Sequence, residues 1–124
     1  MSHILTEEDK DISAKFIVLG LLVDTLEREK QSIAASTIRM QNPFLELVEV
    51  ILKKVRMELI ETKRIMGKKG IKVFNREVVN EDFWVYKYLV RGYNSEFRFL
   101  KYALKMMMEN KMRDYLALEK NNNN

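Results

Sequence analysis

Few side chains in this sequence could carry out acid–base, nucleophilic or metal chemistry. The chain of 124 residues has no cysteine and one histidine, His3, which precedes the first expected helix. A disulfide framework, a thiolate zinc site and a cysteine nucleophile are therefore excluded, and we interpret His3 as a solvated terminal residue. Two carboxylate pairs, Asp9 with Asp11 and Glu58 with Glu61, could form an acid–base or metal pair. Without histidine partners they are more simply surface charges.

The glycine-rich and nucleophile patterns of common enzyme classes are also absent. There is no Walker loop, no dinucleotide-binding glycine pattern, no nucleophile elbow and no zinc-binding helix. We therefore predict no catalytic residue, no metal, no cofactor and a protein that is not an enzyme.

Basic residues on and after the second expected helix could contact the phosphates of nucleic acid. The chain has 22 Lys and Arg against 18 Asp and Glu, and its first 30 residues are net acidic while the remainder is net basic. The candidate residues are Lys53, Lys54, Arg56, Lys63, Arg64, Lys68 and Lys69. Because glutamates interleave with them, as on a solvated helix face, DNA or RNA binding is the alternative prediction and not the main one.

The segment 83–91 alternates aromatic and other residues, which is typical of a strand with two different faces. Trp84, Tyr86 and Tyr88 could stack nucleic-acid bases, with Lys87 and Arg91 nearby. In a small α+β protein, such a face more often forms the core beneath the helices, and this is the reading we prefer.

Apolar residues in the first and last helices exceed what one packing partner can cover. Met106, Met107 and Met108 are consecutive and cannot all point the same way, and the first helix is apolar nearly all round between Phe16 and Val23. We expect a homo-oligomer, or else an unidentified protein partner. The predicted contact residues are Phe99, Tyr102, Met106, Met108, Ile17 and Leu21.

The first helix is expected to begin after Thr6, where Asp9 completes a capping-box-like start, and to run to about Lys30. Its apolar run, Phe16 to Val23, is far shorter than the ~20 residues of a membrane span. The acidic N-terminus does not resemble a secretory leader. We therefore expect a cytoplasmic protein that does not contact the membrane.

The second helix is expected to span roughly 43–66. Asn42 is a good N-cap, Pro43 suits the first helical position, and Gly67 lies where the helix would end. Its predicted buried arc consists of Phe44, Val48, Ile51, Leu52, Val55, Leu59 and Met66.

Strands and a last helix follow. After residue 70 the apolar residues recur at every second position, which predicts a strand within 71–79 and a second strand over 83–91. With a turn at 80–82, the two strands form a β-hairpin. The last helix is expected to begin behind Ser95 and to run to about Leu118, while the asparagine tail 121–124 is expected to be disordered.

These elements predict a single, mostly helical α+β domain over residues 1–120, ordered helix, helix, β-hairpin, helix, with the two long N-terminal helices packed as an antiparallel pair. The expected function is that of a small non-enzymatic protein-interaction or assembly module. The alternative is a DNA- or RNA-binding regulator of variant winged-helix type, because helices here precede a hairpin and a closing helix.

Four short segments resemble a known group of proteins. They are the segments 42–49 (NPFLELVE), 57–63 (MELIETK), 70–73 (GIKV) and 91–93 (RGY). Together they resemble the YhjD-like group of small proteins of Bacillus and its relatives, and the similarity extends over most of the chain except the asparagine tail. The resemblance implies a bacterial protein, cytoplasmic or phage-derived, and carries over no functional residue.

Overall fold

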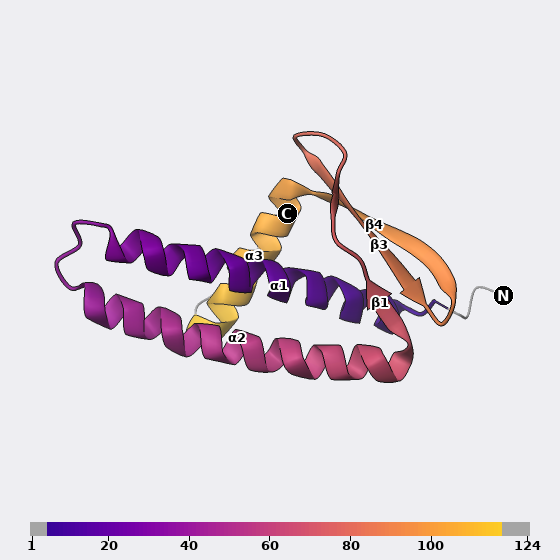
Figure 1. The fold of residues 1–124 in the computed structure, drawn as a ribbon, viewed down its shortest axis with the longest axis horizontal. Coiled ribbons are helices and arrows are strands. Elements are labelled where there is room, and N and C mark those ends of the chain that lie inside the picture. The colour runs from indigo at the N-terminus through magenta and orange to yellow at the C-terminus, as the bar shows by residue number, and fades with distance from the viewer. Residues whose placement is uncertain (1–4, 118–124) are drawn as a thin grey trace.

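The structure, a computed structural model, describes residues 5–117 (Figure 1). In chain order its elements are α1 (Glu7–Ala34), α2 (Gln41–Lys69), β1 (Ile71–Val73), β2 (Glu77–Val78), β3 (Phe83–Val90), β4 (Tyr93–Leu100) and α3 (Lys101–Leu116). The predicted α+β fold is confirmed: two long helices pack together and are followed by a strand hairpin and a C-terminal helix. His3 and the asparagine tail lie outside the described residues.

Helix α1 begins as predicted at a capping box. The Thr6 hydroxyl accepts a hydrogen bond from the Asp9 backbone N–H at 3.0 Å, and the Asp9 carboxylate accepts one from the Thr6 N–H at 3.0 Å. The predicted end at Lys30 is wrong, since the helix continues to Ala34. No glycine or proline interrupts the four additional residues.

Both predicted ends of α2 are wrong by a few residues. The helix begins at Gln41 behind Met40, which makes no side-chain capping bond, and the Gln41 amide instead donates to the Ser36 carbonyl at 2.8 Å. The helix passes through Gly67 and ends at Lys69. It is capped by Gly70, whose φ of 67° is the left-handed conformation that glycine adopts without strain.

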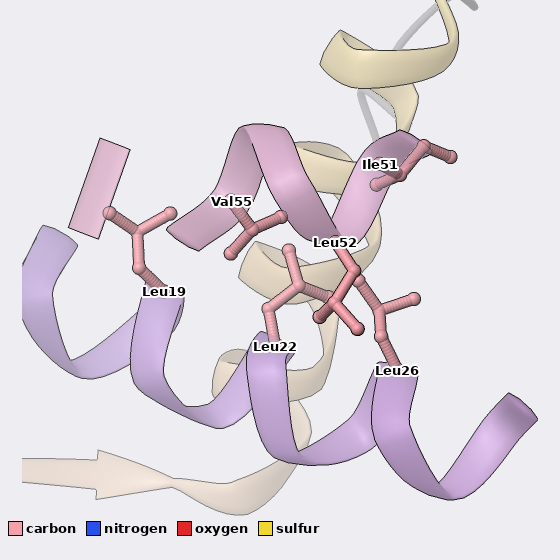
Figure 2. Packing of buried hydrophobic residues seen from close by; sticks show 6 residues of the cluster. All are labelled: Leu19, Leu22, Leu26, Ile51, Leu52 and Val55. Carbon is pink, nitrogen blue, oxygen red and sulfur yellow. The ribbon is translucent and has the colours of Figure 1, made fainter. Parts of the chain in front are cut away.

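The helices α1 and α2 form the predicted antiparallel pair (Figure 1). Three leucines of α1 interdigitate with three aliphatic side chains of α2 in a buried cluster, which Figure 2 shows. Its members are Leu19, Leu22, Leu26, Ile51, Leu52 and Val55. Towards the α1–α2 connection the pair extends beyond the sheet and α3, and no residue between Leu26 and Ile51 is fully buried.

Strand β3 lies at the centre of an antiparallel sheet. It pairs with β4 along its whole length and with β1 and β2 on its other side. The prediction that the last helix begins behind Ser95 is wrong, because residues 93–100 form β4 and α3 begins at Lys101. The positive φ angles of Arg91 (47°) and Gly92 (90°) make a tight two-residue turn that directs the chain back along β3.

The aromatic face of β3 lies under the helices, as we preferred. Tyr86 and Tyr88 are buried, Tyr86 in a cluster with Ile17, Val18 and Leu104. This packing holds the sheet against the N-terminal half of α1 (Figure 1). Within the described residues, no helix is long and apolar enough to cross a membrane.

Candidate interaction surfaces

The six predicted contact residues lie in different environments and do not form one surface. Ile17 is 4% exposed in the core, and Leu21 and Met108 pack against the same cluster. Phe99 is half-buried on β4, where its ring lies 6.1 Å from the ring of Tyr86 in an edge-on arrangement.

The two remaining contact residues belong to α3. Met106 is half-buried, whereas Tyr102, in the first turn of α3, is 68% exposed and is the one member of the six that is not at least half-buried. The exposed and half-buried aromatic residues therefore gather near the junction of β4 and α3.

A group of exposed apolar residues on α2 was not predicted to be a contact surface. Five apolar residues of α2 are between 45% and 67% exposed, and we call them the α2 outer stripe: Phe44, Leu47, Val50, Met57 and Ile60. Phe44 was assigned to the buried arc, and its exposure corrects that assignment. The other four are among the apolar residues left outside the buried arc, together with Leu45 and Ile65, and this is the signal by which the stripe could have been found.

A cleft of about 690 Å³ lies between α1, α2 and the segment that joins β1 to β2. Its lining is mainly apolar, with Gly20 of α1 contributing no side chain, and carries the charged groups Asp24, Lys63 and Arg76. The Arg76 guanidinium lies 4.1 Å from the centre of the Trp84 ring. The cleft holds no nucleophile beside a base, and no cluster of three His, Asp or Glu residues suited to a metal occurs among residues 5–117.

Glu58, one of the candidate carboxylates, connects all three helices. It lies 3.0 Å from the Lys15 ammonium of α1 and 2.8 Å from the Lys111 ammonium of α3, and it accepts a hydrogen bond from the Tyr115 hydroxyl. Burial by itself would raise the pKa of Glu58, but these donors outweigh it and lower the pKa to about 2. Its supposed partner Glu61 pairs instead with Arg64, one turn along α2.

Asp9, the other candidate, is 1% exposed and also has a structural partner. Its carboxylate lies 2.6 Å from the Arg91 guanidinium, which in turn donates to the Lys69 carbonyl at 2.6 Å. Burial raises the pKa of Asp9, but the hydrogen bonds from Arg91 and Thr6 outweigh it and the net pKa is lowered. Asp9 therefore joins the start of α1 to the end of α2 and the hairpin turn, while Asp11 is exposed.

Three of the seven basic residues proposed to bind nucleic acid have carboxylate partners. Arg56 pairs with Glu27 of α1, Arg64 with Glu61, and Lys69 with Glu8 at 2.8 Å. Lys53, Lys54, Lys63 and Lys68 are exposed along α2. The basic surface is therefore smaller than the sequence suggests.

Two comparisons place the chain among known proteins. A family model described as YhjD protein matches residues 4–120. The "Uncharacterized protein YhjD" of Bacillus subtilis (strain 168) is 23% identical over 112 residues, which make up 90% of this chain and 92% of that protein. No solved structure matches the chain.

Proposed function

We propose that this chain, which belongs to the YhjD family, is a small non-enzymatic protein-interaction module that associates with a second copy of itself. The observation that carries the proposal is the α2 outer stripe. None of its five residues belongs to the cluster that α2 forms with α1, so this apolar surface contributes nothing to that core. Large exposed apolar side chains gathered on one helix are typical of protein contacts.

The non-enzymatic part of the proposal is supported by what the carboxylates do. Asp9 and Glu58, one from each candidate carboxylate pair, both form ion pairs with basic residues of other segments of the chain. Each connects elements that are distant in the sequence, which is a structural role.

The test of self-association is the mass of the purified protein in solution. Light scattering after size-exclusion chromatography, at several protein concentrations and at low and high salt, should give a mass above that of the 14.8 kDa monomer. A monomer at every concentration would contradict self-association. A monomer that carries nucleic acid at low salt and sheds it at high salt would favour the alternative, a DNA- or RNA-binding regulator.

A double variant of the α2 outer stripe, Met57→Glu with Ile60→Glu, tests whether the stripe lies in the contact between two copies. The quantity compared is its mass in solution. Its matched control is Lys68→Glu, which changes the net charge by the same amount on the same helix but outside the stripe. Loss of the assembly in the double variant alone would place the stripe between the two copies. An assembly that survives would leave the stripe available to a different protein.

A further inference from the structure

Strand β4 is an eight-residue edge strand with one unpaired side. It pairs with β3, and no other strand of residues 5–117 pairs with it. The Lys101 N–H donates to the Asp82 carbonyl at 2.8 Å, in register with the β3–β4 pairing. Along an antiparallel pair every second residue directs its backbone N–H and C=O to the same neighbour. Since residue 101 bonds to the β3 side, residues 95, 97 and 99 also direct these groups to β3. Residues 94, 96, 98 and 100 therefore direct theirs to the free edge.

The charges along this edge are self-complementary. Glu96 and Arg98 are both exposed on the face of the sheet opposite the helices, and they flank Phe97. Charged side chains commonly prevent a free edge from pairing with another chain. Opposite charges two residues apart nevertheless allow an antiparallel copy in one register, in which each charge faces its complement.

Only some registers of two antiparallel β4 strands are compatible with the backbone. The free N–H and C=O groups belong to the even-numbered residues of β4. To bond with each other, an even-numbered residue of one copy must lie opposite an even-numbered residue of the other. A register centred on residue 96 or 98 places two Glu96 or two Arg98 residues directly opposite each other, which is destabilising. The register centred on Phe97 places Glu96 opposite Arg98 in both directions.

The inner face of the sheet favours the same register. Phe97 is half-buried and stacks on Tyr88, with ring centres 4.5 Å apart, and on Phe99 at 5.5 Å. In the register centred on Phe97, the two Phe97 residues face each other at a non-hydrogen-bonded position, where side chains approach most closely. Pairing would therefore cover apolar surface that the monomer leaves half exposed.

We infer that two copies of this chain pair along β4, antiparallel and centred on Phe97, so that their two sheets become one continuous sheet. This inference rests on the proposed function, because it presupposes self-association, and it names a contact other than the α2 outer stripe, together with its register. It leaves the α2 outer stripe of both copies uncovered by this contact.

Charge reversal tests the register directly. Residue 96 of one copy faces residue 98 of the other. Glu96→Arg alone therefore places arginine opposite arginine, and Arg98→Glu alone places glutamate opposite glutamate. Each should raise the dissociation constant of the dimer on the order of tenfold or more. The combined swap, Glu96→Arg with Arg98→Glu, restores opposite charges and should restore the dimer. An equimolar mixture of the two single variants should form a heterodimer for the same reason. Light scattering measures all four cases.

Cysteine cross-linking provides a second measurement, since the chain has no cysteine of its own. Phe97→Cys places two thiols opposite each other and should give a disulfide-linked dimer on mild oxidation. Ser95→Cys is the matched control on the same face, because residue 95 faces residue 99 of the other copy and its two thiols lie on the order of 13 Å apart along the strand. Ser95→Cys should therefore remain uncross-linked.

The outcomes separate this inference from the proposed function. A monomeric wild-type protein would overturn both. A wild-type dimer that is unaffected by the single charge reversals, or that cross-links through residue 95 as readily as through residue 97, would overturn β4 pairing while self-association stands. Should Phe97→Cys fail to fold, the charge variants decide alone, because Glu96 and Arg98 are exposed and lie outside the core.

Discussion

Replacing Glu58 by glutamine should weaken the contact among all three helices. The carboxylate of this α2 residue lies within hydrogen-bonding distance of Lys15 on α1 and of Lys111 and Tyr115 on α3. Glutamine preserves the size of the side chain and removes its charge. The substitution therefore isolates the charge-assisted part of these interactions.

The magnitude follows from the pKa of Glu58, which falls from 4.5 to about 2 in the folded protein. Each unit of difference between the folded and unfolded states corresponds to about 1.4 kcal/mol, so the ionised carboxylate contributes on the order of 3 kcal/mol to the free energy of unfolding at neutral pH. Because the folded pKa is the lower one, this contribution is complete above about pH 5 and is lost as the pH falls toward about 2.

Urea unfolding followed by far-UV circular dichroism, at one protein concentration and at a series of pH values, measures this contribution. The Glu58→Gln variant should be less stable than wild type at neutral pH and should converge with it in acid. Glu61→Gln is the matched control, since Glu61 pairs with Arg64 on the exposed face of α2 and its loss should change stability little. Equal effects of the two variants, or an unchanged acid dependence in Glu58→Gln, would refute the reasoning.

Three further substitutions test individual parts of the fold by chemical denaturation. Leu52→Ala removes a fully buried side chain of the α1–α2 cluster and should cost about 2–5 kcal/mol, so a loss below about 1 kcal/mol would contradict its place in the core. Thr6→Ala removes the side-chain cap of α1 and should cost about 1 kcal/mol, whereas Thr6→Ser should cost much less. Gly92→Ala places a side chain at a φ of 90° and should cost about 1–3 kcal/mol; a neutral result would argue against the two-residue turn.

Local signals predicted the features that local interactions determine. The capping box at Thr6 and Asp9 needs residues only three apart, and the alternation of β3 reflects a strand with one buried face. These two predictions were confirmed. The general arrangement of helices and hairpin followed from them together with the periodicity of α2.

Strand β4 was mistaken for helix because its apolar residues satisfy both periods. Phe97 and Leu100 are three residues apart, as on a helix face, while Phe97 and Phe99 alternate as on a strand. A short segment cannot resolve this ambiguity, and pairing with β3 decides it. The turn that begins the strand also lacks the usual Asn-Gly or Asp-Gly pair, since Arg91 precedes Gly92.

The candidate surfaces depend on contacts that spacing cannot predict. Glu58 meets Lys15 and Lys111, which are 43 and 53 residues away in the chain, and Arg56 meets Glu27 of the neighbouring helix. Such pairs exist only after α1, α2 and α3 have packed. The exposed edge of β4 likewise depends on which strands pair with β3, which no local pattern specifies.

The end of the α1–α2 pair nearest the connection between the two helices projects from the rest of the fold, and its local stability differs from that of the core. Between Leu26 and Ile51 two helices support each other without a third layer, whereas the leucine cluster nearer the middle also receives side chains from α3. Amide hydrogens at this end should therefore exchange with solvent through local openings that cost less than global unfolding. A protein that binds Phe44 and Leu47 would slow this exchange. Binding to α2 would therefore lower the amide exchange rates of both α1 and α2 at this end.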